Sequence, residues 1–267
     1  MANLESSTAT GPAKRALDPA GEATLELFRE NDAYSELLLD RLLALAPRAL
    51  SGRFLEVGCG IGNLTRILLR RPGLTYLRAI DIDPAYVERV KREVSDPRLE
   101  VTVSRAEEFC PAELSGNAGQ FDAIICSNVL EHIEDHVQVL RNFRRMLRPG
   151  GVALILVPAH PSLYCGLDKN LSHFRRYQKH DFHEISAQAD LEVLRLRHFN
   201  PIGAFGWWLN GKLMRRKELP GGQLGLYTRF AIPLSRLVDR LNPLPIGVSL
   251  LCALGRRSAE GPAVGSP

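Results

Sequence analysis

Three glycines alternate with other residues at Gly58, Gly60 and Gly62, directly after the apolar run at 54–57. Because glycine has no Cβ, a loop of this kind can approach a ligand closely and can adopt positive φ. Helical periodicity resumes at Asn63, so the segment predicts a strand, a loop and a helix, as in nucleotide sites of doubly wound sheets. Dinucleotide sites use G-x-G-x-x-G, and the Asn at position 63 disfavours a nicotinamide cofactor.

An acidic residue, Asp81, lies near the end of the second predicted strand at 74–82, about 20 residues after the glycine loop. A carboxylate in this place can accept hydrogen bonds from both hydroxyls of a ribose. Asp83 precedes Pro84 and instead predicts the N-cap of the next helix, at 85–94. We therefore expect Asp81 to be the principal single contact to the cofactor.

Histidines and a carboxylate follow the later strands, where they could act on a second substrate. His132 lies in the segment SNVLEHIED at 127–135, after the fourth predicted strand. His160 follows the fifth, and the polar stretch at 161–182 carries Asp168 and His173. Ligands of open α/β sheets bind outside the carboxyl ends of the strands. We expect a general base among these histidines, with His132 first and Asp168 orienting or binding.

Four motifs occur in order over about a hundred residues: Glu56 with the G-x-G-x-G loop, Asp81, N-V-L-E-H at 128–132 and R-P-G-G at 148–151. Together they resemble the class I S-adenosylmethionine (SAM)-dependent methyltransferases, including the ubiquinone-pathway O-methyltransferase-like group, over about 50–200. The resemblance implies SAM as cofactor. It implies cofactor contacts from Glu56, Gly58, Cys59, Gly60, Gly62, Asp81, Ile82, Ala106, Glu107, Ser127 and Asn128.

The adenine site departs from the family pattern in one place. Arg105 stands where the family usually has an Asp for the adenine amino group, whereas Ala106 matches the small residue beside the ring. We expect Glu107 to take the adenine contact.

The acceptor half is less specified by the resemblance. H-x-R-x-aromatic at 173–177 resembles methyltransferases encoded among sugar- and lipid-modifying genes. The expected catalytic residues are His132, His173 and Asp168, and the expected substrate contacts are His160, Arg176, Tyr177 and Trp207. Small-RNA ribose methyltransferases bind magnesium through E-x-x-E-H, but Asn128 replaces the first carboxylate here. An amide weakens a site for a hard cation, so we expect no required metal.

Periodicity predicts how these residues are positioned. Helices are expected at 23–50, 63–71, 85–94, 140–147 and 180–189, with strands at 54–57, 74–82, 99–103, 121–126, 152–157, 191–198 and 247–256. The stretch LRPGG at 147–151 predicts a turn, and 161–182 predicts a loop. The fold class is α/β, a Rossmann-like doubly wound seven-stranded sheet with helices on both faces. The resemblance implies that its last strand is antiparallel.

Length and composition favour one domain at 22–257 between a disordered leader at 1–21 and a flexible tail at 258–267. The net charge of +4 is too small to predict binding to DNA. Five cysteines without C-x-x-C predict reduced thiols and a cytoplasmic location. No apolar stretch reaches the roughly 18–20 residues of a membrane span.

An insertion at 202–245 separates the last two strands and contains both tryptophans beside the basic run at 215–217. This composition is typical of an interfacial membrane helix, although a substrate lid with a solvated basic edge is the favoured interpretation. A peripheral contact with the inner face of the membrane through 202–217 is therefore one hypothesis for this insertion.

The expected function is methyl transfer from SAM to a small-molecule or lipid-linked acceptor, at oxygen. One alternative is RNA ribose 2'-O-methylation, which predicts magnesium dependence and a continuous basic groove. Another is a non-catalytic SAM-binding or interaction protein, which Arg105 leaves open.

Overall fold

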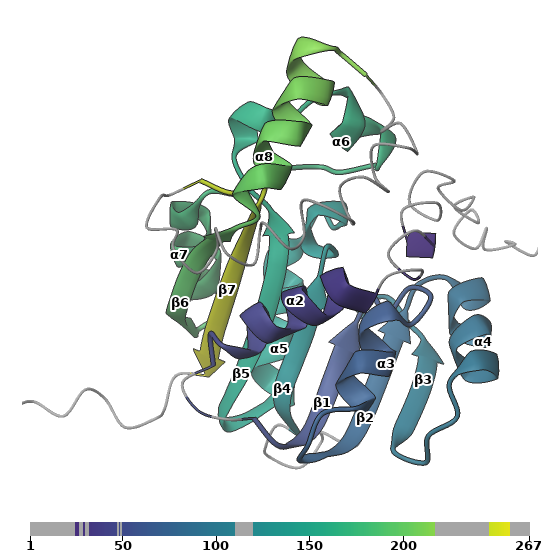
Figure 1. Cartoon of the computed structure of the whole chain (residues 1–267). Helices are drawn as coiled ribbons and strands as arrows, with labels where there is room; N and C mark the ends of the chain where they lie inside the picture. Colours follow the sequence, from purple (N-terminus) through teal and green to yellow (C-terminus); the bar gives the residue numbers. More distant parts are fainter. Residues whose placement is uncertain are drawn as a thin grey trace, which may run out of the picture.

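The computed structural model describes residues 25, 26, 29, 32–46, 48, 50–109, 120–216 and 246–256. The expected leader, the expected tail and positions 217–245 of the insertion lie outside the described residues. The described part contains a seven-stranded sheet in the order β3-β2-β1-β4-β5-β7-β6. Strand β7 pairs antiparallel with both β5 and β6, and the other pairs are parallel. The predicted fold class is confirmed (Figure 1).

The strands are β1 (Gly52–Val57), β2 (Leu74–Asp81), β3 (Leu99–Val103), β4 (Phe121–Ser127), β5 (Leu147–Pro158), β6 (Leu191–Phe199) and β7 (Ser249–Arg256). The α-helices are α2 (Asp32–Leu43), α3 (Asn63–Leu69), α4 (Pro84–Glu93), α5 (His136–Met146), α6 (Gly166–Asn170), α7 (Lys179–Gln188) and α8 (Pro201–Trp207). Two 3-10 helices, η2 (Leu130–His132) and η3 (Pro161–Leu163), and a π-helix, η4 (Trp208–Leu213), complete the described elements.

Apolar side chains fill the space on both faces of the sheet. Helices α2 and α3 cover one face, where Leu42 and Leu68 are fully buried. Helices α5 and α7 cover the other, with Phe143 and Phe182 fully buried. Burial of side chains of this size stabilises each by about 1.5–3 kcal/mol relative to exposure. Central strands that are covered on both faces have continuous apolar sequences. The sequence pattern could predict their positions for this reason.

Helix α4 begins as its sequence predicts. The Asp83 carboxylate accepts a hydrogen bond of 2.8 Å from the backbone N–H of Ala85, and Pro84 occupies the first helical position. The carboxylate thereby satisfies an N–H that would otherwise lack a partner at the helix start. Asp83 is therefore committed to the helix, as expected, and Asp81 is left for the loop.

The R-P-G-G segment is not the simple turn that the sequence predicts. Strand β5 already begins at Leu147, which pairs with Phe121, and the register then shifts before Ala123 pairs with Val152. Gly150 has φ +75°, and a Cβ on Gly151 would lie 2.9 Å from the Phe121 carbonyl oxygen. The glycines allow an irregularity inside the strand pair, so the strand continues through the predicted turn.

The stretch at 161–182 is also more ordered than the predicted loop, because it contains η3, the short helix α6 and the start of α7. Asp168 in the first turn of α6 accepts a hydrogen bond from the backbone N–H of Cys165, which closes the helix start. Helices α6 and α8 lie together beyond the carboxyl ends of the strands (Figure 1). Within the described part of the chain, no helix is both long and apolar enough to cross a bilayer.

Candidate functional site

The glycine loop follows β1 at the carboxyl edge of the sheet. Gly58, Gly60 and Gly62 have φ of +76°, +51° and +85°, a region that favours glycine. The N–H of Gly60 donates to Asp81 Oδ2 at 2.8 Å, which holds the loop against the end of β2. A Cβ on Gly58 would overlap the Val129 side chain, which follows β4. The missing side chain at Gly58 thus allows the segment after β4 to pack directly against the glycine loop.

Asp81 ends β2 beside the glycine loop, and its contact with a ribose stays a prediction. Its Oδ1 accepts from the Asp83 N–H at 2.9 Å, and each carboxylate oxygen keeps a lone pair for a further donor. Burial raises the pKa of the Asp81 carboxyl, although backbone hydrogen bonds partly oppose that shift. The neighbouring Ile82 is a largely exposed apolar side chain.

The other expected cofactor residues divide into interior and edge positions. Glu56 is buried beneath the loop, where it accepts a hydrogen bond of 2.6 Å from the Thr65 hydroxyl, and burial raises its pKa to about 8. Glu107 forms an ion pair of 2.7 Å with Arg105, the residue that departs from the family pattern. Arg105 therefore fixes the carboxylate that we expected at the adenine edge. The remaining expected contacts lie at the strand ends: Cys59 and Ala106, both buried, and Ser127 and Asn128.

Hydrogen bonds bring the segment at 173–177 onto η2, which follows β4. The N–H of Phe174 donates to the Glu131 carbonyl oxygen at 2.8 Å, and the Tyr177 hydroxyl donates to the Leu130 carbonyl oxygen at 3.1 Å. As a result, the rings of His132 and His173 meet edge to face with centroids 4.8 Å apart. The two histidines that we expected to be catalytic therefore share one site.

Asp168 positions His173. Its side chain is 0% exposed and accepts hydrogen bonds from His173 Nδ1 at 3.1 Å and Arg176 Nε at 2.6 Å. Burial alone would raise the pKa of Asp168, but the His173 hydrogen bond and the Arg176 charge outweigh it and hold the pKa below its usual range. In a neutral imidazole, a carboxylate acceptor at Nδ1 selects the tautomer in which Nε2 is the acceptor or ligand.

Three of the expected substrate contacts occupy supporting positions. Tyr177 is 1% exposed, and its hydroxyl also lies 2.9 Å from His136 Nδ1. Arg176 is buried and donates to the Ala159 carbonyl oxygen at 2.9 Å. Its guanidinium stacks 4.6 Å from the Trp207 ring and so connects α8 to the sheet edge. The role of these residues in substrate binding stays a prediction, since the geometry gives them packing partners instead.

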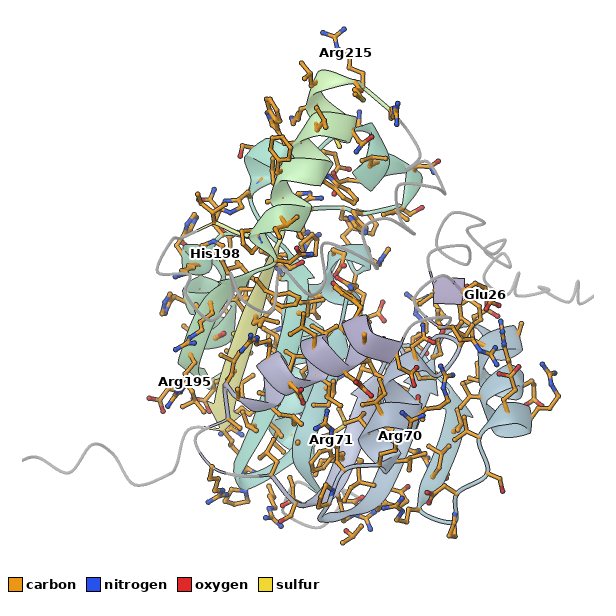
Figure 2. All side chains as sticks on the ribbon, viewed as in Figure 1. Glu26, Arg70, Arg71, Arg195, His198 and Arg215 are labelled. Carbon is orange, nitrogen blue, oxygen red and sulfur yellow. The ribbon has the colours of Figure 1, made fainter. Side chains whose placement is uncertain are left out.

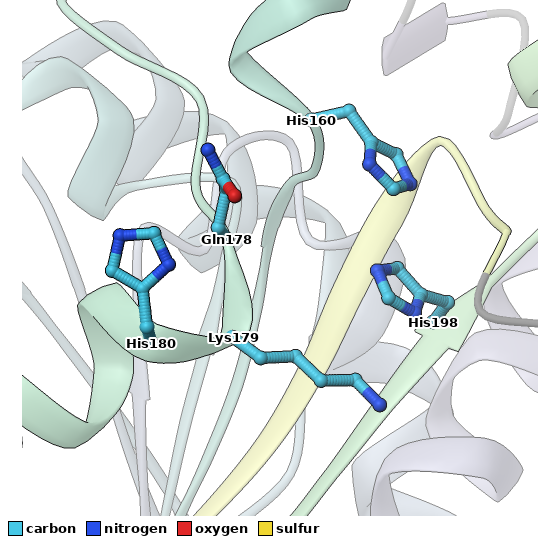
Figure 3. Close-up of a pocket in the computed structure, with 5 residues that line it drawn as sticks. All are labelled: His160, Gln178, Lys179, His180 and His198. Atoms are coloured by element: carbon cyan, nitrogen blue, oxygen red, sulfur yellow. The ribbon is translucent and has the colours of Figure 1, made fainter.

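His160, the fourth expected substrate contact, lines a pocket of about 250 Å³ together with Gln178, Lys179, His180 and His198 (Figure 3). The rings of His160 and His198 stack in parallel with centroids 4.8 Å apart. Burial lowers both pKa values, that of His198 to about 4 with help from His160 and Lys179, so both rings are neutral near pH 7. His198 comes from β6, and nothing in its local sequence marks it.

One further group combines residues that are remote in sequence. Glu131, His132 and His173 place one ligand atom each within 4.8 Å of one another, which makes them a candidate metal site. Sequence reasoning considered a metal only within the motif at 128–132. The ligand that it missed is His173, which the backbone bond between Phe174 and Glu131 brings in.

A family profile described as a methyltransferase domain matches residues 28–200. The chain belongs to this methyltransferase family. A curated relative, the ubiquinone biosynthesis O-methyltransferase of Actinobacillus pleuropneumoniae, is 25% identical over 72% of this chain and 86% of its own.

Solved structures agree in fold. Phosphoethanolamine N-methyltransferase 2 of Haemonchus contortus, in complex with SAM, is 18% identical with a TM-score of 0.60, over 92% of this chain and 59% of its own. Geranyl diphosphate methyltransferase, also in complex with SAM, is 16% identical with a TM-score of 0.59, over 92% and 93% of the two chains. The comparisons confirm the predicted enzyme class, a SAM-dependent methyltransferase.

In this methyltransferase the two halves of the site lie on neighbouring strands. Strands β1 and β2 carry the glycine loop and Asp81, and β4, which pairs with β1, leads into η2 with its histidine. The side chain of Val129 sits directly against Gly58. The glycine loop therefore lies against the segment that leads into η2.

Proposed function

We propose that this methyltransferase transfers the methyl group of SAM to a hydroxyl oxygen of a small-molecule or lipid-linked acceptor. The contact between Gly58 and Val129 carries the proposal, because Val129 leads into η2, which ends at His132, whose ring meets that of His173. The name of the Actinobacillus relative, an O-methyltransferase, supports oxygen as the acceptor atom. When bound, SAM supplies a methyl group already activated by its sulfonium.

The protein has to align the acceptor with that methyl group and to take up its proton. The glycine loop would follow the cofactor with its backbone, and Asp81 would accept from the ribose hydroxyls. On the acceptor side, Asp168 accepts from Nδ1 of His173, so the neutral imidazole would present Nε2 as its acceptor. His173 and His132 would bind the acceptor hydroxyl and accept its proton, a contribution that is typically about 10²–10⁴-fold in rate.

The experiment separates cofactor binding from chemistry with two variants. Calorimetry with S-adenosylhomocysteine should show a loss of about 10-fold or more for Asp81→Ala, since hydrogen bonds to a carboxylate contribute about 1.5–3 kcal/mol. With a short-chain ubiquinone precursor bearing a free hydroxyl as probe acceptor, His173→Asn should lose about 10²-fold or more in turnover and keep its affinity for S-adenosylhomocysteine. The exposed His183 of α7 provides the matched control, His183→Asn.

The cofactor site and the catalytic histidine can each be contradicted separately. Full cofactor affinity in Asp81→Ala would contradict the assigned cofactor site. Turnover in His173→Asn equal to that of His183→Asn would remove the histidine from the chemistry.

A specific observation also favours access to the acceptor from a membrane surface. Helix α8 and η4 carry exposed apolar side chains, with Phe205 63% and Leu213 62% exposed. Basic side chains accompany them, and Arg215 lies at the tip of the molecule beyond the sheet (Figure 2). Apolar and basic side chains on one protruding segment are typical of interfacial binding to anionic lipid.

Flotation with vesicles of phosphatidylcholine and phosphatidylglycerol tests this contact. The wild-type protein should float, less so at high salt, and a double Phe205→Ser, Leu213→Ser variant should not. Val103→Ser, which changes an exposed apolar residue at the end of β3, is the control. Wild-type protein that stays at the bottom would exclude the membrane contact.

A further inference from the structure

Glu131, His132 and His173 offer one carboxylate and two imidazoles from two segments that are distant in sequence. Their ligand atoms lie within 4.8 Å of one another. Ligands that share one ion at bond lengths of about 2.0–2.2 Å must approach somewhat closer than this, which small side-chain rotations can provide. We propose that these three residues bind one divalent transition-metal ion at η2.

The buried carboxylate of Glu131 gives the first reason to expect a metal ion here. Its side chain is 0% exposed, and within the described residues neither carboxylate oxygen has a hydrogen-bond partner. Leaving an ionised carboxylate buried without a partner costs several kcal/mol. Asp168, which is equally buried, shows the usual solution, with donors from His173, Arg176 and Cys165. Glu131 lacks such donors, and a cation is a partner that its position can accept.

The surroundings of His173 are the second argument. Histidines that bind metals almost always donate the other ring N–H to a carboxylate or carbonyl, which fixes the ring and its tautomer. Here Asp168 accepts from Nδ1 of His173 and is itself held by Arg176. The backbone bond from Phe174 to Glu131 fixes the distance between the two ligand segments. The ligand nitrogen Nε2 is therefore oriented by a support built from buried groups.

The ligand types indicate which ion to expect. Two imidazoles and one carboxylate suit manganese, iron, cobalt or zinc, whereas magnesium prefers oxygen ligands alone. The expectation that no metal is required rested on Asn128 in place of a carboxylate. That reasoning weighed ligands inside the motif only, and His173 supplies from outside it a ligand that suits a softer ion.

The role of the ion rests on the proposed function, whereas its binding does not. Three protein ligands leave positions open, as in catalytic metal sites. An acceptor hydroxyl bound there would lose its proton to water at a lower pH than it does free in solution, because a divalent cation stabilises the alkoxide or phenolate. The three residues would then position and activate the acceptor through the ion rather than by direct proton transfer.

Metal binding is measured on the full chain without turnover. Protein dialysed against EDTA and then freed of the chelator is titrated with CoCl₂, and the visible absorption of bound cobalt is recorded. One equivalent should bind saturably. Glu131→Gln and His173→Asn should weaken binding at least ~10-fold, and Asp168→Asn about 10–100-fold. Excess MgCl₂ should not displace the cobalt.

Matched substitutions on α7 provide the control, since Glu184 and His183 are exposed there. Glu184→Gln and His183→Asn should bind cobalt as the wild type does. The proposal fails if the wild type shows no saturable site, or if Glu131→Gln and His173→Asn bind like these controls. Displacement by equimolar magnesium would overturn the assignment of a transition metal. Circular dichroism checks folding, and His132→Asn replaces any variant that fails to fold.

Calorimetry with S-adenosylhomocysteine on the same samples keeps the two proposals apart. Cobalt binding without affinity for S-adenosylhomocysteine would remove the proposed function and leave the metal site in place. Affinity for S-adenosylhomocysteine with no cobalt site would remove the metal, and direct proton transfer by His173 would then remain.

Discussion

Replacing Gly58 with alanine tests the contact on which the proposed site depends. Gly58 has φ +76°, and a Cβ there would overlap the Val129 side chain. The left-handed backbone costs a residue with a Cβ about 1–2 kcal/mol. Forcing a methyl group into a packed contact adds typically 1–3 kcal/mol. The unfolded chain with alanine has less conformational entropy to lose on folding, which offsets about 0.4–1 kcal/mol of this cost. We expect Gly58→Ala to lower the free energy of unfolding by roughly 2–4 kcal/mol.

Urea and thermal unfolding measure this loss, which corresponds to a fall in Tm of roughly 5–15 °C at this chain length. A second substitution, Val129→Ala, separates the two causes. In the Gly58→Ala background, it should remove the steric overlap and recover that share of the lost stability. The cost of the left-handed backbone should remain, so a double-mutant cycle should give a coupling of about 1–3 kcal/mol. Affinity for S-adenosylhomocysteine should fall in Gly58→Ala as well.

Gly206 provides the matched control, because a Cβ at this α8 position meets no described atom within 4 Å. Alanine favours a helix over glycine by about 1 kcal/mol, so Gly206→Ala should leave stability unchanged or raise it. If Gly58→Ala unfolds like Gly206→Ala, the loop does not need glycine at position 58. The contact with Val129 would then be no argument for a shared site.

Two further predictions concern buried polar groups. Burial raises the native pKa of Glu56 to about 8 from a usual 4.5, so the native state holds a proton that the unfolded chain releases. Stability should therefore fall as pH rises from about 4.5 through 8. Urea unfolding at several pH values should show a flatter dependence for Glu56→Gln, and an unchanged slope would contradict the shift. Tyr177→Phe removes the bond to the Leu130 carbonyl and should cost about 1–2 kcal/mol in urea unfolding, with S-adenosylhomocysteine affinity unchanged. The control is Tyr76→Phe, whose hydroxyl bonds to Glu100 at the surface and should cost less than about 0.5 kcal/mol; equal losses would contradict a buried role.

The sequence by itself determined the fold of this protein and the class of its cofactor. Alternating glycines after an apolar run, an acid at the end of the next strand and the period of each helix are signals contained within single elements. Strand β3 at Leu99–Val103 and the Asp83 cap were predicted correctly for this reason. The spacing that ends in Asn63 also distinguished the cofactor class. Such signals arise from local backbone chemistry, which neighbouring residues specify.

Tertiary structure decided which side chains come together at η2, after β4. His173 reaches Glu131 through a backbone bond between Phe174 and the 3-10 helix after β4, and no local period encodes that pairing. The same packing buries Tyr177, which its sequence context had suggested as a substrate contact. Contacts between remote segments depend on how strand ends and loops pack in space. The glycine loop could therefore be recognised from its residues alone. Glu131, His132 and His173 come together only in the folded chain, where Asp168 supports His173.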